Sequence, residues 1–191
     1  MAAERPQARK RIKLFAGIAL DERVQHKLFA VAERLRERGL NARFESVEKY
    51  HLTLAFLGWV EPDRLDVLAS ALQTAADGHA GFDLAFDRIG AFPHERRPRV
   101  IWIGCRKQPA AYARIARAVQ SVYAALSFAF KDDPVAHVTI ARVKAATNAL
   151  PTLSAFSRIG ARVSSLTLFE SLPAGATTRY EVRAQAPLSA I

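Results

Sequence analysis

Two tetrapeptides of one pattern, His51-Leu52-Thr53-Leu54 and His137-Val138-Thr139-Ile140, occur in the two halves of the chain. In a strand, residues i and i+2 point to the same side. Each copy therefore predicts an imidazole and a hydroxyl on one face and an apolar pair on the other. An expected strand and helix precede each copy, and this repeated order predicts two related lobes, since a solenoid needs more and shorter repeats.

The pattern of apolar residues predicts strands and helices in alternation along the chain. Val24, Leu28, Val31 and Leu35 recur at helical spacing after Asp21, an expected N-cap. Further helices are expected over 62–78, 112–126 and 148–156. Strands are expected over 12–20, 42–45, 52–57, 82–88, 99–104, 135–142, 163–170 and 178–184. Several strand pairs have links too short for a crossover helix and must be antiparallel, so the expected class is α+β.

The division of the chain follows from the same pattern. Residues 1–11 are expected to be a flexible N-terminal segment, since their start is polar and rich in alanine and arginine. No linker-like stretch separates the two halves, so we expect 12–191 to form one bilobal domain with a pseudo-twofold relation between its halves. A central cleft between the lobes is the expected place of a site.

The charge of the chain points to anionic partners. Lys and Arg number 28 against 18 Asp and Glu, which gives a formal net charge of +10. This surplus favours RNA, nucleotides or acidic membranes and does not choose among them. The single cysteine, Cys105, cannot form an intramolecular disulfide or a thiolate metal cage, which is typical of a protein from a reducing compartment.

The apolar run over 14–20 follows four basic residues, a weak likeness to a secretory signal. The run is short, lacks a small-residue cleavage site and leads into two acidic residues, which favours a buried first strand instead. No apolar stretch approaches the roughly 20 residues that span a bilayer. We therefore expect a soluble, cytoplasmic protein without a membrane partner.

The paired motifs predict acid–base chemistry without a metal. One neutral histidine can take a proton from an attacking oxygen, and one protonated histidine can give a proton to a leaving oxygen. Threonine hydroxyls can donate hydrogen bonds to oxygens on which negative charge develops. A single His-x-Thr is usually structural, but two matched copies favour a site. No spacing of His, Cys or acidic residues suggests a metal, and no Gly-rich phosphate loop is present, so no metal and no cofactor are expected.

These features resemble the 2H phosphoesterase superfamily, and within it the RNA 2′,3′-cyclic phosphodiesterase family, also called bacterial 2′-5′ RNA ligases. The likeness includes both motifs, and its flanking matches are Phe56-Leu57-Gly58, Ala141-Arg142 and Leu168-Phe169-Glu170-Ser171. It implies two mainly antiparallel sheets flanked by helices, with the motifs on central strands of opposing sheets. It also implies hydrolysis of RNA or nucleotide 2′,3′-cyclic phosphates to 2′-phosphomonoesters, a role in RNA processing.

The resemblance further implies residue roles. His51 would be the proton donor, His137 the base, and Thr53 and Thr139 would hold phosphate oxygens. The residues alone leave the two histidine roles interchangeable. Arg142 matches a phosphate-binding arginine, but strict alternation places it on the face opposite His137, so that role requires a bulge.

Two segments depart from the family pattern. Ala136 precedes the second histidine, where many relatives have proline. Residues 46–50 read Ser-Val-Glu-Lys-Tyr, where relatives often have Pro-Glu-Asn-Leu before the first histidine. These changes bear on substrate preference more than on catalysis.

Two other functions remain open at this point. The same site run in reverse would join RNA ends through a 2′-5′ linkage, acting on tRNA-like ends. A non-catalytic RNA-binding module would use the positive charge alone and would bind in a salt-sensitive way. The sequence leaves the oligomeric state open, with a monomer expected.

Overall fold

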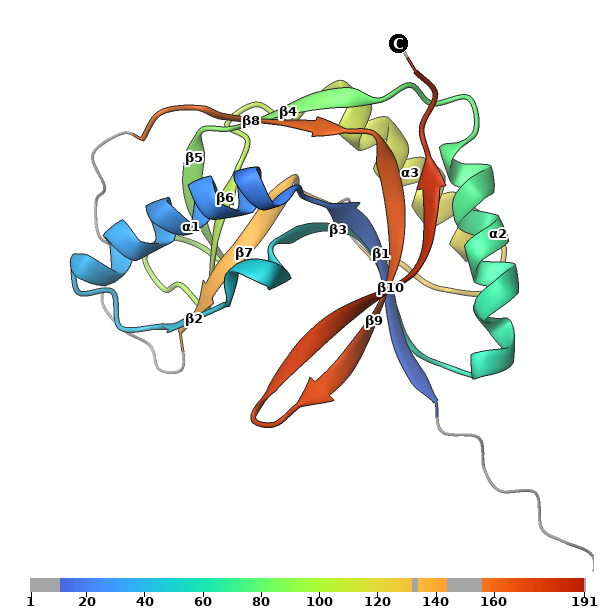
Figure 1. The fold of residues 1–191 in the computed structure, drawn as a ribbon, viewed down its shortest axis with the longest axis horizontal. Helices are drawn as coiled ribbons and strands as arrows, with labels where there is room; N and C mark the ends of the chain where they lie inside the picture. Colours follow the sequence, from blue (N-terminus) through green and yellow to red (C-terminus); the bar gives the residue numbers. More distant parts are fainter. Residues whose placement is uncertain (1–10, 132–133, 144–155, 191) are drawn as a thin grey trace, which may run out of the picture.

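The computed structural model describes residues 11–131, 134–143 and 156–190 (Figure 1). Within these residues there are three α-helices: α1 (Glu22–Glu37), α2 (Leu65–Ala76) and α3 (Ala110–Ala124). Short 3₁₀ turns, η1 (Val47–Lys49) and η2 (Pro62–Arg64), flank the third strand. The strands are β1 (Ile12–Ala19), β2 (Arg43–Phe44), β3 (His51–Val60), β4 (Phe82–Phe86), β5 (Arg88–Phe92), β6 (Val100–Gly104), β7 (His137–Arg142), β8 (Ile159–Val163), β9 (Ser165–Ala174) and β10 (Thr177–Pro187).

Most strands belong to one large antiparallel sheet. Its order is β10-β9-β1-β3-β7-β6-β5, with β2 paired to β7, and a second sheet consists of β4 and β8. The α+β class is confirmed. The placement of the two motif strands on opposing sheets is wrong: β3 and β7 are neighbours in the large sheet, joined at the single residue pair Leu52–Val138. This single pair is where the two halves of the large sheet meet.

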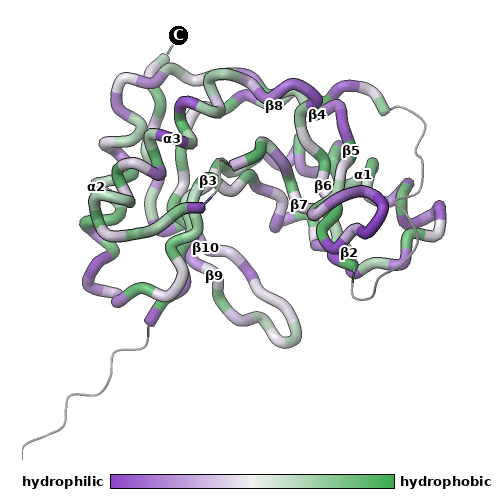
Figure 2. Tube along the Cα trace, turned by 180° about the vertical axis from the view of Figure 1, so that it is seen from behind, coloured by the Kyte–Doolittle hydropathy of each residue, from purple (hydrophilic) through white to green (hydrophobic). Residues whose placement is uncertain are grey.

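One lobe holds β10, β9, β1 and β3 with α2 and α3, and the other holds β7, β6, β5 and β2 with α1. Helix α1 contacts β7 and β8, whereas α2 contacts β9 and β10 and α3 contacts β3 (Figure 1). Buried residues from both lobes form one continuous hydrophobic cluster. In Figure 2 the trace through β3 is mostly green, because its residues are largely apolar and supply part of that cluster. The hairpin of β9 and β10 extends beyond the rest of the sheet.

Helix α1 forms as its sequence predicts. The Asp21 carboxylate accepts a hydrogen bond from the Val24 backbone N–H at 2.8 Å and so caps the first turn. The four apolar residues at helical spacing are buried. Gly39 has a φ of +80°, the left-handed conformation that ends a helix and that a side chain disfavours. None of the helices within the described ranges is both long and apolar enough to cross a bilayer.

The predicted strands over 82–88 and 163–170 are wrong in extent. The first is two strands, β4 and β5, separated by Asp87, and the second region holds the end of β8 and the start of β9, separated by Ser164. One residue without a Gly or Pro signal is enough to bend the chain from one sheet into the other, and apolar alternation does not reveal such a bend. The expected helix over 148–156 and the segment 1–11 lie almost wholly outside the described residues.

Candidate active site

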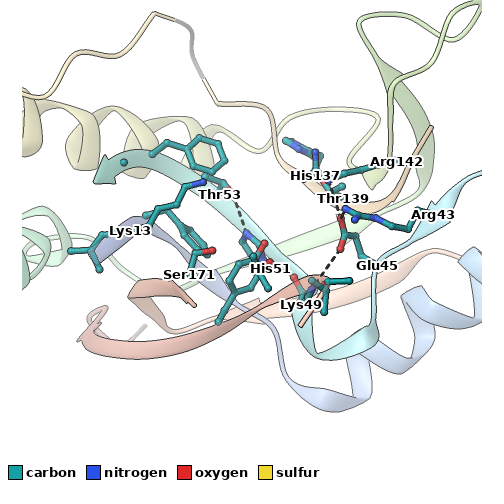
Figure 3. A pocket seen from close by; sticks show the side chains of 18 of the residues that line it. Lys13, Arg43, Glu45, Lys49, His51, Thr53, His137, Thr139, Arg142 and Ser171 are labelled. Atoms are coloured by element: carbon teal, nitrogen blue, oxygen red, sulfur yellow. Dashed lines mark hydrogen bonds and ion pairs between the residues drawn. The ribbon is translucent and has the colours of Figure 1, made fainter. Parts of the chain in front are cut away.

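The pairing of β3 with β7 brings the two motifs together. Leu52 and Val138 are partners and fully buried, so their side chains face the core. The flanking residues of each strand point to the other side of the sheet. All five side chains predicted for the site line one pocket of about 760 Å³, shown in Figure 3. They are His51, Thr53, His137, Thr139 and Arg142.

A β-bulge in β7 turns Arg142 toward this pocket. Thr139 and Ala141 pair with consecutive residues of β6, so Ile140 is an extra residue in the ladder. Ile140 and Ala141 are both buried, which breaks the alternation of inward and outward side chains. The side chain at position 142 therefore lies on the side of His137, and the bulge that its expected role required is present.

The same irregularity occurs in β3. Thr53 and Ala55 pair with consecutive residues of β1, so Leu54 is the extra residue. The position equivalent to Arg142 is then Phe56, which is 71% exposed and also lines the pocket. The two motif strands thus share their backbone irregularity as well as their sequence, while the residue that follows the bulge is a cation in one lobe and a phenyl ring in the other.

Both imidazoles are held by a carbonyl two residues upstream. His51 Nδ1 lies 2.6 Å from the Lys49 oxygen, and His137 Nδ1 lies 2.8 Å from the Val135 oxygen. A carbonyl only accepts, so each Nδ1 carries the proton. In the neutral ring Nε2 is then the acceptor, and Nε2 of His51 lies 3.1 Å from the Thr53 hydroxyl. Each neutral histidine can therefore take up a proton at Nε2.

Aromatic rings surround both histidines. The ring of His51 lies 4.8 Å from Phe15, 5.6 Å from Phe169 and 5.0 Å from Tyr180 between centroids. His137 lies 5.0 Å from Phe92. These rings cover part of each imidazole and leave the rest facing the pocket. The sequence did not predict that aromatic rings pack around His51, because Phe15, Phe169 and Tyr180 come from three different strands.

Burial is the largest cause that lowers the pKa of His51, which falls to about 4. The hydrogen bond to the Lys49 carbonyl acts in the opposite direction and raises the pKa, and the nearby His137 adds a smaller lowering. Burial also lowers the pKa of His137. The free protein consequently holds both rings mainly in the neutral form near pH 7. A bound phosphate would favour the protonated form of a ring beside it, because opposite charges attract.

The low pKa of His51 predicts a loss of stability in acid. In the unfolded chain this ring protonates near pH 6.5, so between about pH 6.5 and 4 the unfolded state binds more protons and the free energy of unfolding falls with the pH. At pH 5 the contribution is about 2 kcal/mol relative to pH 7. Urea unfolding of the wild type and of His51→Gln at both pH values measures it. Equal pH dependence of the two proteins would refute the assignment.

The pocket also contains charged side chains that sequence reasoning missed. Glu45 lies between Arg142 and Lys49 in Figure 3, and Lys13 lines a more distant part of the pocket. Both Glu45 and Lys49 belong to the segment before the first motif, where composition alone gave no sign of a site. Among residues 11–131, 134–143 and 156–190, no group of three His, Cys, Asp or Glu side chains could hold a metal ion.

Comparison with known proteins identifies the family of the chain. A family model described as LigT like Phosphoesterase matches residues 18–102. The RNA 2′,3′-cyclic phosphodiesterase of Aeropyrum pernix is 30% identical over 171 residues, which cover 83% of this chain and 95% of that protein. The protein of the same name from Thermotoga maritima is 31% identical over 136 residues, or 70% of this chain and 71% of its own.

The fold is similar to solved structures of the same group. Escherichia coli LigT complexed with 3′-AMP superposes with a TM-score of 0.77 at 27% identity, covering 94% of this chain and 99% of that one. The fold and the sequence are together those of a LigT-like phosphoesterase. The chain belongs to the LigT-like family of RNA 2′,3′-cyclic phosphodiesterases, as its motifs predict.

Proposed function

We propose that this protein hydrolyses RNA 2′,3′-cyclic phosphodiesters to 2′-phosphomonoesters without a metal ion. The observation that carries the proposal is the shared pocket of two imidazoles and two threonines on adjacent strands. The printed names of its relatives supply the substrate class. Solved structures of Escherichia coli LigT contain 3′-AMP or phosphate. They support the proposal that the pocket of this protein binds a phosphate group.

In the proposed reaction, a water oxygen attacks the phosphorus atom and the bond from phosphorus to the 3′ oxygen breaks. His137 Nε2 takes the proton of the attacking water, and protonated His51 gives its Nε2 proton to the departing 3′ oxygen. Proton exchange with solvent then restores the starting forms. The family resemblance supplies this assignment of acid and base. The negative phosphate must raise the pKa of His51 for it to act as the acid.

The other pocket residues stabilise the charge that develops on the phosphate. Thr53 and Thr139 donate hydrogen bonds to non-bridging oxygens, and the Arg142 guanidinium provides a charge-assisted donor. Phe56, which takes the place in β3 that Arg142 takes in β7, supplies apolar surface to the pocket. Water access is limited by the rings around His51.

A product-resolved assay on an oligonucleotide with a 2′,3′-cyclic phosphate end tests the proposal. The expected product is the 2′-phosphomonoester alone, because only the 3′ oxygen leaves. Formation of the 3′-monoester would contradict the proposal. Binding of the oligonucleotide without any product would also contradict it and would favour a non-catalytic RNA-binding module. Adding a fragment with a 5′-hydroxyl to the same assay detects 2′-5′ joining, which bulk water disfavours.

Metal removal gives a separate prediction. Turnover should persist within about twofold in excess EDTA, since proton transfer by two imidazoles near neutral pH needs no metal-bound water. Dialysis against EDTA, followed by assay with and without added Mg²⁺ or Mn²⁺, measures this. Strict dependence on an added ion would contradict the proposed mechanism while leaving the family assignment in place.

A further inference from the structure

A single carboxylate in the wall of the pocket lies among three cations. Glu45 is 12% exposed and its oxygens lie 2.9 Å from Arg142 Nε, 3.5 Å from Lys49 Nζ and 3.9 Å from an Arg43 nitrogen. The arginine side chains are about half exposed, whereas Lys49 is only 7% exposed. All four residues line the pocket that holds both histidines (Figure 3).

The strand register explains why a carboxylate is needed at this place. Arg43 of β2 and Arg142 of β7 are direct partners across the antiparallel pair, an arrangement of like charges that is destabilising by itself. The Glu45 backbone N–H donates to the Ile140 oxygen at 2.9 Å, which anchors position 45 beside the bulge of β7. The carboxylate is thereby fixed next to both guanidinium groups.

The contact with Arg142 also sets the direction of its guanidinium. The hydrogen bond to Glu45 uses Nε, one of five N–H donors on the planar group. Holding Nε fixes the plane of the group, so that its remaining donors are oriented before an anion arrives. A long side chain that is half exposed would otherwise lose rotamer freedom on binding, at a cost in affinity.

The second cation held by Glu45 connects the pocket to the hairpin. Lys49 Nζ donates a hydrogen bond to the Thr177 hydroxyl at the tip of the β9–β10 hairpin, and the Lys49 carbonyl accepts from His51 Nδ1. The segment that departs from the family pattern thus supplies a buried lysine that contacts the general acid, the carboxylate and the hairpin. A neutral residue at position 49 could not form this ion pair.

We propose that Glu45 is a positioning residue for the phosphate site, which acts by orienting Arg142 and, through Lys49, the hairpin tip. The inference rests on the proposed function of the pocket. For the loss of the Glu45 charge, this inference and simple electrostatics predict changes of opposite sign in the affinity for anions. Removal of a negative charge beside an anion site should strengthen anion binding, whereas loss of an orienting partner should weaken it.

The test is the variant Glu45→Gln, which keeps the shape of the side chain and removes its charge. Its affinity for inorganic phosphate, measured by isothermal titration calorimetry, should fall about tenfold, because a misoriented guanidinium loses part of its charge-assisted hydrogen bonding to the anion. The KM for adenosine 2′,3′-cyclic phosphate should rise by a similar factor while kcat changes about threefold or less. Tighter phosphate binding would overturn the inference.

A double-mutant cycle decides whether Glu45 acts through Arg142. In the Arg142→Ala background, Glu45→Gln should cause a much smaller loss of phosphate affinity, since the guanidinium to be positioned is gone and only the route through Lys49 remains. Equal losses in both backgrounds would overturn the route through Arg142. Glu61→Gln is a matched control, because Glu61 forms an ion pair with Arg11 at 2.7 Å outside the pocket, and it should bind phosphate as the wild type does.

The conservative variant Glu45→Asp separates positioning from folding. It keeps the charge on a shorter arm, so it should show an intermediate phosphate affinity at a melting temperature close to that of the wild type. Should Glu45→Gln fail to fold, unchanged phosphate affinity in folded Glu45→Asp would overturn the inference. The wild-type product assay is independent of this series: absence of turnover there refutes the proposed function, whereas phosphate binding still tests Glu45.

Discussion

Replacement of either His51 or His137 by alanine should lower kcat on an RNA 2′,3′-cyclic phosphate by roughly 10²–10⁴-fold. Each imidazole moves a different proton in the proposed reaction, so neither can replace the other. The two single variants should lose activity to a comparable extent, and the double variant should lose little more, because residues that act as a unit are non-additive. Steady-state kinetics of the purified variants measures these effects.

His26→Ala is the matched control for this series. His26 lies on the exposed face of α1, away from the pocket, and its removal should leave kcat unchanged. Phosphate binding by calorimetry should survive in both catalytic variants, which shows that the pocket is intact. Full activity in either His51→Ala or His137→Ala would refute the mechanism with two histidines.

Replacement of Thr139 by valine should lower kcat by about 10²–10³-fold, the loss that follows removal of one donor to a developing negative charge. Valine keeps the branched shape that suits β7 and removes the hydroxyl alone. Because the hydrogen bond strengthens as charge develops, kcat should fall more than KM rises. Kinetics on the same cyclic phosphate separates the two constants.

Thr167→Val provides a control with the same change of atoms. Thr167 is fully buried on β9 and its hydroxyl has no hydrogen-bond partner among the residues that the structure describes. Its removal should leave kcat unchanged and the free energy of unfolding equal or slightly higher, since an unpaired buried hydroxyl is unfavourable. If Thr139→Val retains the kcat of the wild type, Thr139 does not stabilise the transition state.

Local pattern was enough to predict the sides of the motif strands and the first helix. His51 and Thr53 alternate with buried Leu52, as period-2 geometry requires. Helix α1 has its cap at Asp21 and its end before Gly39 because both residues act on the adjacent backbone. Such features depend on neighbours in the sequence and can therefore be predicted from it.

Features that depend on which strands pair with one another could not be predicted from the sequence. The pairing of β3 with β7 in one sheet and the bulges at Leu54 and Ile140 come from register between distant segments. A bulge has no residue signature here, since neither position is a glycine. The cations around Glu45 are likewise assembled from β2, η1 and β7, so their proximity could not be read from spacing along the chain.

A crystal structure of the protein with a 2′-phosphomonoester product bound tests the central claim most directly. One phosphorus atom should lie between the imidazoles, with Nε2 of His51 and Nε2 of His137 each about 2.6–3.2 Å from one of its oxygens. Phosphate seated elsewhere in the pocket, or in contact with just one of the two rings, would contradict the account.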